Sequence, residues 1–217
     1  MKIIVGIILF SIVFTLEEKD DISFRYGVLG RLQSQNKQVV ELQDSSKIQT
    51  DDEIRINVGY EKETHLYVIY QASQGGEYIL FYPEESNTVV NMVDLPDTLY
   101  KTVLHWAPFS DPTGFETFYF INSSFVLENL SNLFKRYNKV NEKGRIKLAK
   151  KIQIELDNLD PESKQELASI SGRLEKPVVG GVAFRGDDGE VLKDMSLTHS
   201  CTGNLGIAFK KFILNHQ

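Results

Sequence analysis

The chain has 217 residues and a formal net charge of −6, so it is long enough for one well-buried domain and lacks the basic surface that nucleic-acid binding requires. Hydrophobic residues make up 41% and charged residues 25%, as in ordinary globular proteins, and the 13 Phe and 9 Tyr favour β structure. The single cysteine, Cys201, excludes an intramolecular disulfide and a cysteine-rich zinc site.

The first residues are typical of an export signal. Met1-Lys2 precedes an uncharged apolar run over residues 3–16, and the charged residues 17–21 follow. This order predicts a signal peptide over residues 1–16, because the run is shorter than the roughly 20 residues that span a bilayer. The small-x-small cleavage pattern is missing, so an uncleaved anchor and an N-terminal core strand remain the alternatives. We expect residues 22–217 to form one domain in the periplasm or cell envelope, or to be secreted.

The most regular part of the chain is residues 51–83. Three strands are predicted there, at residues 54–60, 66–71 and 77–82. The first alternates apolar and polar side chains, the second is apolar on both faces, and the third ends at Pro83 after the turn signal Gly75-Gly76. We expect one antiparallel meander around which the remaining elements pack. Further strands are predicted at residues 23–29, 39–42, around 48, 88–93, 95–104 and 115–122.

After Ser123-Ser124 the apolar residues follow helical spacing, and either serine is a suitable N-cap for a helix. Three helices are predicted, over residues 125–137, over residues 144–158 and from Asp160-Pro161 to Pro177. Their apolar stripes are Leu127, Leu130 and Phe134; Ile146, Ala149, Ile152, Leu156 and Leu159; and Leu167, Ile170 and Leu174.

The tail returns to β structure. A hairpin is predicted from residues 178–185 and 191–197, which flank Gly186-Asp187-Asp188-Gly189, and a last strand is predicted over residues 205–214. The sequence therefore predicts an α+β fold, a mostly antiparallel sheet or sandwich with a helical segment inserted at about residues 124–176.

The central pattern resembles a bacterial family, domain-of-unknown-function family 4384. The resemblance covers roughly residues 48–124 and is carried by Asp51-Asp52 before the first strand, His65 to Tyr70, the Gly75-Gly76 turn with a strand ending at Pro83, and Gly114-Phe115-Glu116 to Ser123. Asp51-Asp52 stands where a Gly-Asp pair is usual in the family. The resemblance implies a β-rich extracytoplasmic or regulatory module, and it implies no catalytic residues.

Few residues point to chemistry. His199 and Cys201 are two apart and could pair as base and nucleophile, but packing is the favoured interpretation. His65, His105, His199 and His216 are too scattered to predict a metal site, and we expect no cofactor. Residues 135–151 form a basic segment. Either this segment contacts an anionic surface, or it is a solvated helix face whose charge is balanced by Glu155, Asp157, Asp160 and Glu162.

The predicted contact surface is the loop over residues 106–114, which has an aromatic start and two prolines. Aromatic side chains dominate binding hot spots, so we expect Trp106, Phe109 and Phe115, with an exposed sheet edge, to contact a protein partner. The sequence thus predicts an exported, non-enzymatic protein-interaction module. A glycan-binding or small-molecule-binding domain that uses surface tyrosines is the alternative, and an enzyme built on His199 and Cys201 is a third hypothesis.

Overall fold

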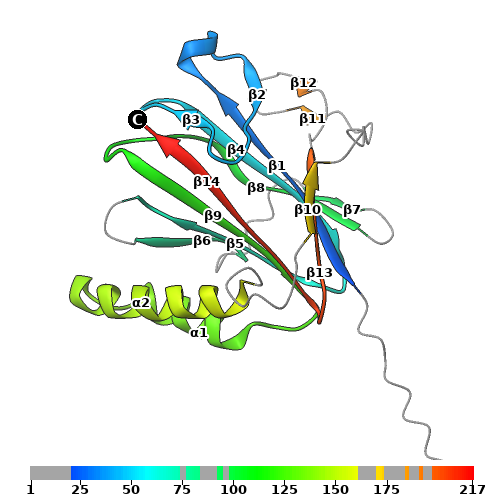
Figure 1. The fold of residues 1–217 in the computed structure, drawn as a ribbon, viewed down its shortest axis with the longest axis vertical. Coiled ribbons are helices and arrows are strands. Elements are labelled where there is room, and N and C mark those ends of the chain that lie inside the picture. Colours follow the sequence, from blue (N-terminus) through cyan, green and yellow to red (C-terminus); the bar gives the residue numbers. More distant parts are fainter. Residues whose placement is uncertain are drawn as a thin grey trace, which may run out of the picture.

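The computed structural model describes residues 21–73, 77–83, 98–160 and 197–217 with their side chains, and the strand backbone of residues 92–94, 170–173, 184–185 and 191–192. Within these residues the chain forms mostly antiparallel sheets and two helices (Figure 1). The α+β class predicted from the sequence is confirmed. The predicted signal peptide and the turn residues Gly75-Gly76 lie outside the described residues.

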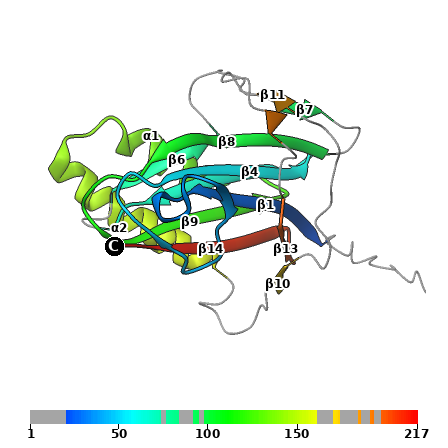
Figure 2. The ribbon, with the colours of Figure 1, turned by 90° about the horizontal axis from the view of Figure 1, so that it is seen from above.

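The first large sheet, sheet A, is centred on β1 and β4. Its strands follow the order β10-β13-β1-β4-β8-β7, with β2 beside β1, and all of these pairs are antiparallel. Figure 2 shows β8, β4 and β1 lying side by side. The strands are β1 (Ile22–Arg31), β2 (Val39–Glu41), β4 (Glu53–Glu61), β7 (Met92–Asp94), β8 (Thr98–Pro108), β10 (Ile170–Arg173) and β13 (His199–Gly203).

The second large sheet, sheet B, follows the order β3-β14-β9-β5-β6. Its pairs are antiparallel except for the short parallel pair of β3 with β14. The strands are β3 (Lys47–Ile48), β5 (His65–Gln71), β6 (Tyr78–Tyr82), β9 (Gly114–Ser123) and β14 (Ile207–His216). A separate pair joins β11 (Phe184–Arg185) to β12 (Val191–Leu192), and a short 3-10 helix, η1, covers Gln33–Gln35.

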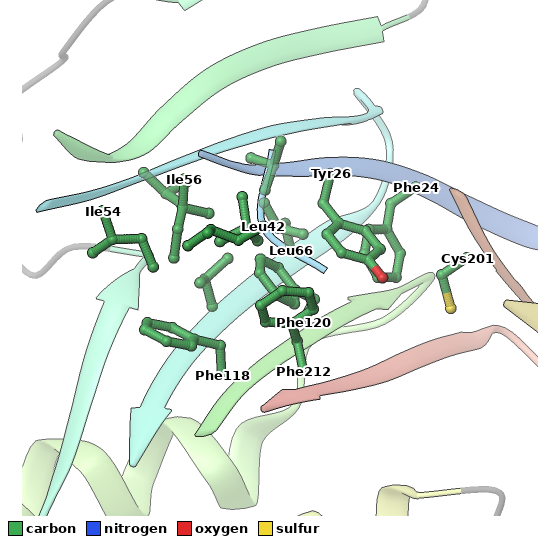
Figure 3. Packing of buried hydrophobic residues seen from close by; sticks show 14 of the residues in the cluster. Phe24, Tyr26, Leu42, Ile54, Ile56, Leu66, Phe118, Phe120, Cys201 and Phe212 are labelled. Atoms are coloured by element: carbon green, nitrogen blue, oxygen red, sulfur yellow. The ribbon is translucent and has the colours of Figure 1, made fainter. Parts of the chain in front are cut away.

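The larger apolar core contains inward-facing side chains from both sheets (Figure 3). Phe24 and Tyr26 of β1 stack on Phe120 of β9, with ring centroids 6.4 and 4.8 Å apart. Each such buried ring contributes roughly 1.5–3 kcal/mol relative to an exposed one. This core therefore joins two sheets between which the chain passes several times along the sequence.

The second core lies between sheet B and the helices α1 (Glu128–Tyr137) and α2 (Glu142–Leu159). Leu130, Phe134, Ile152 and Leu156 of the helices belong to it, together with Tyr67, Ile69, Tyr119, Ile121 and Phe209 of the sheet. Strand β5 thus places Leu66 and Val68 in the first core and Tyr67 and Ile69 in the second. The prediction that this strand is covered on both faces is confirmed.

The predicted three-stranded meander is wrong. Strand β4 pairs with β1 and β8 in sheet A, whereas β5 pairs with β9 and β6 in sheet B. The short turn between β4 and β5 carries the chain from one sheet to the other, which lets the apolar face of β4 and one face of β5 share the larger core.

The helix predictions are correct in part. Helix α1 begins at Glu128 rather than at residue 125, and its N-terminus has no side-chain cap from Ser123 or Ser124. Instead, the Leu127 N–H donates to the Tyr67 hydroxyl at 3.0 Å. In α2, Leu148 is buried where the sequence pattern had placed Ile146, and Ile146 is exposed. Asn141 caps α2 by accepting from Gly144 N–H at 3.0 Å.

The third predicted helix is wrong at residues 170–173. This segment is strand β10, which pairs with β13, so the helical segment described here is shorter than residues 124–176. Leu167, Leu174 and Pro177 lie outside the described residues, as does the Gly186-Asp187-Asp188-Gly189 turn. The antiparallel pair of β11 and β12 agrees with the predicted hairpin, and β14 with the predicted last strand.

Candidate binding surface

The three predicted contact residues lie in different surroundings. The predicted loop is wrong for Trp106, which belongs to β8, is half-buried, and has the Arg31 guanidinium 4.1 Å from its ring centroid. Phe109 is only 8% exposed and belongs to the larger core, so it offers no surface. Phe115 of β9 is 66% exposed. The structure therefore does not gather these three aromatic residues into one contact loop.

His199 and Cys201 lie on β13 and are both buried. The Cys201 thiol hydrogen-bonds the carbonyl oxygen of Phe209 at 3.4 Å, and burial raises the pKa of this thiol to about 12. The His199 Nε2 lies 3.2 Å from Glu41 Oε1. A reactive cysteine needs its thiolate form, so a buried thiol with a raised pKa is unfavourable as a nucleophile.

A polar chain that the sequence pattern did not indicate connects the ends of β9 and β14, with Glu116 and His216 buried at its centre and Thr50 and Asp111 exposed at one end. Glu116 accepts from the Tyr70 hydroxyl at 2.6 Å, and its other oxygen lies 3.5 Å from His216 Nδ1. The His216 Nε2 lies 3.2 Å from the Thr50 hydroxyl, which in turn donates to Asp111 Oδ1 at 3.1 Å. These residues are far apart in sequence, and no spacing rule joins them.

The chain of groups has the order hydroxyl, imidazole, carboxylate, which is the order that activates a nucleophile. Here the single Thr50 proton is directed to Asp111, an acceptor, so His216 donates to Thr50 instead of taking its proton. We therefore interpret the chain as a link that fixes the end of β14 against β9 and the residue 109–113 segment.

The helical layer is held to sheet B by tyrosine and glutamine side chains as well as by apolar packing. Gln153 of α2 accepts from the Tyr78 hydroxyl and from Gln71 Nε2, and the Tyr119 hydroxyl donates to Gln71. The Tyr137 hydroxyl of α1 accepts from Tyr78 N–H at 3.2 Å. These contacts fix which face of each helix points away from the sheet.

The outward face carries a groove between α1 and α2 with a volume of about 340 Å³. It is lined by Asn129, Asn132, Leu133, Arg136, Lys151, Ile154 and Glu155. Ile154 is 60% exposed although it belongs to a firmly docked helix. The groove thus combines two apolar side chains, two cations, one carboxylate and two amides, and this net positive lining suits a segment that has both apolar and acidic groups.

The charge of this layer differs from that of the rest of the chain. Between Glu128 and Leu159 there are eight Lys and Arg against four Asp and Glu, whereas the whole chain has a net charge of −6. Residues 135–151 hold all eight of these cations. One is engaged with the sheet, because Arg145 lies 3.7 Å from Glu77. The predicted basic segment is therefore a local basic surface on an acidic protein.

A second hollow, of about 330 Å³, lies over the outer face of sheet A. It is lined by Ser23, Phe24, Arg25, Gly59, Tyr60, Glu61, Thr98 and Tyr100. Gly59 leaves it open, because a Cβ there would lie 2.9 Å from the Tyr100 ring. Aromatic rings from Phe24, Tyr60 and Tyr100 beside hydroxyl and charged groups are a lining suited to a small polar ligand.

Comparison of the chain with family models, with curated proteins and with solved structures finds no match. The resemblance to family 4384 therefore stays a prediction. Among the helices that the structure describes, none is long and apolar enough to cross a membrane. Within the same residues, no three His, Cys, Asp or Glu side chains gather in a way that could hold a metal ion.

Proposed function

We propose that this chain is an exported, non-enzymatic module of the cell envelope that binds an acidic segment of a protein partner in the groove between α1 and α2. The observation that carries the proposal is the exposure of Ile154 beside Leu133, with Arg136 and Lys151 lining the same groove. An apolar centre with charged groups around it is the usual anatomy of a protein-binding surface.

The acidic character of the partner segment follows from charge complementarity. The chain as a whole is acidic, so a basic partner would meet repulsion over this layer and attraction elsewhere. An acidic segment is attracted to the helical layer in particular, and Arg136 and Lys151 give it two specific partners in the groove.

Export to the periplasm or cell envelope rests on the sequence of residues 1–16, and the resemblance to family 4384 agrees with it. We also propose that the two large sheets constitute an open sandwich that supports the helical layer. In this arrangement the sheets supply rigidity and the helices supply the contact surface.

The experiment uses the purified protein as bait for a native envelope extract, in four versions. Ile154→Asp and Lys151→Glu alter the groove, and Ile146→Asp is the matched control, since Ile146 is 54% exposed on the same helix but does not line the groove. We expect wild type and Ile146→Asp to retain the same partner and the two groove variants to lose it. Equal retention by all four baits, or retention by none, would contradict the proposal.

A second candidate function rests on the hollow over sheet A. The sequence alternative of glycan or small-molecule binding is favoured there by Tyr100, which stands beside Arg25, Glu61 and Thr98. A Gly59→Val substitution would fill the hollow, and loss of a ligand-induced rise in melting temperature in that variant would support this function.

A further inference from the structure

Three large apolar side chains are exposed together at one end of the molecule, and we call them the apolar tip: Phe125, Val126 and Leu205. Their exposed fractions are 42%, 50% and 55%. They come from two connections, between β9 and α1 and between β13 and β14. The two connections are joined, because Ser124 N–H donates to the Gly206 carbonyl oxygen at 2.9 Å. A Cβ at Gly206 would lie 3.6 Å from the Phe125 ring, so the two connections form one surface.

Leu205 occupies a backbone conformation that disfavours it. Its φ is +53°, in the left-handed region where glycine and asparagine are usual and a branched apolar residue is an outlier. The side chain is also exposed, so packing gives little compensation within the described residues. A strained and exposed leucine indicates that the side chain is needed for a contact outside the domain.

The position of the tip relates it to the N-terminal apolar run. Ile22, the first residue of β1, pairs with Gly203, two residues before Leu205. Figure 1 shows the start of β1 beside β13. Residues 3–16 are apolar, and only residues 17–21 separate this run from Ile22. Five extended residues reach at most about 17 Å, so in the uncleaved chain the membrane that holds the apolar run lies close to the apolar tip.

We propose that the apolar tip inserts into the interface of a lipid bilayer and holds the domain against the membrane. Loops that carry aromatic and aliphatic side chains bind such interfaces by burying apolar surface. The charges at this end do not favour anionic headgroups, since Glu63 and Glu128 accompany Lys62. The basic residues of α1 begin only at Lys135, so apolar burial and not charge drives the insertion.

The test places one environment-sensitive dye on the full chain. Cys201 is buried and its raised pKa keeps it unreactive, so an introduced cysteine is labelled selectively. Leu205→Cys reports on the tip, and Gln35→Cys is the control at the opposite end of β1. With phosphatidylcholine vesicles we expect a blue shift of the dye at position 205, none at position 35, and no reversal by added salt.

A second variant separates insertion from folding. Leu205→Asn places a residue suited to the left-handed region at this turn, so the melting temperature should not fall. In a chain labelled through Val126→Cys, it should abolish the blue shift. An unshifted dye at position 205, even on a chain that sediments with the vesicles, overturns the proposal. So does a shift that salt reverses, or one that Leu205→Asn leaves unchanged.

Discussion

The buried link between β9 and β14 makes the sharpest prediction about stability. Glu116 is 2% exposed and holds two partners, the Tyr70 hydroxyl at 2.6 Å and His216 Nδ1 at 3.5 Å. Glu116→Gln keeps the shape of the side chain and removes its charge. The Tyr70 hydrogen bond then becomes a neutral one, and His216 Nδ1 faces an uncharged amide in place of a carboxylate.

The magnitude follows from these two contacts. A hydrogen bond to a charged group contributes about 1.5–3 kcal/mol and a neutral one about 0.5–1.5, so the Tyr70 contact loses about 1 kcal/mol. The amide of the glutamine is also buried beside His216 Nδ1, and a buried polar group that is left without a partner costs about 1–3 kcal/mol. We expect Glu116→Gln to lower the free energy of unfolding by about 2–4 kcal/mol.

The assay is urea unfolding of wild type, Glu116→Gln, Tyr70→Phe and the double variant, with Glu63→Gln as the exposed control. The double variant should be destabilised by less than the sum of the single variants, since Glu116→Gln weakens the hydrogen bond that Tyr70→Phe removes. The control should stay within about 0.5 kcal/mol of wild type. Additive effects, or a Glu116→Gln protein as stable as the control, would refute the link.

Three further predictions concern the core, a turn and a surface aromatic. Burial raises the pKa of Cys201 from near 9 to about 12, so the unfolded chain loses this proton first. Between about pH 8 and about pH 10.5 the free energy of unfolding should therefore fall by about 2 kcal/mol more in wild type than in Cys201→Ala, which keeps the buried tyrosines whose pKa values are also raised; equal pH profiles of the two proteins would contradict this. Gly203→Ala should prevent folding, because its Cβ would lie 1.9 Å from the backbone oxygen of Ile207. The control Thr202→Ala should fold, since Thr202 is exposed. A soluble Gly203→Ala protein that unfolds cooperatively would show that β13 and β14 can separate there. Trp106→Ala should cost about 1 kcal/mol, by removing the ring under Arg31, and leave partner capture intact. Lost capture at unchanged stability would move the contact surface to sheet A.

The sequence predicted the local elements better than their assembly. Strand β5 was recognised as covered on both faces because its apolar residues do not alternate with polar ones. The pairing of β4 and β5 was wrong because a short turn between two strands reads as a hairpin, whether or not the chain changes sheets there. Only the larger core, which takes side chains from both strands, decides between these outcomes.

The candidate site was predicted in part. The basic segment could be predicted from its run of cations. The groove could not be predicted, because the sequence pattern does not show whether Ile146, Leu148 or Ile154 faces the sheet. Which of these residues is buried depends on the rotation of α2 about its own axis, and the hydrogen bond between Gln153 and Tyr78 fixes that rotation. The link joins Tyr70, Glu116 and His216, which come from three strands far apart in the sequence, so no local pattern could reveal it.

Photo-crosslinking tests the central claim, that the groove between α1 and α2 binds an acidic segment, most directly. A photoreactive residue is placed at position 154 in the groove and, in a second protein, at position 146 on the same helix, and both are irradiated in intact cells. We expect one covalent partner from position 154, crosslinked through a peptide rich in Asp and Glu, and none from position 146. Equal crosslinking from both positions, or a crosslinked peptide without acidic residues, would contradict it.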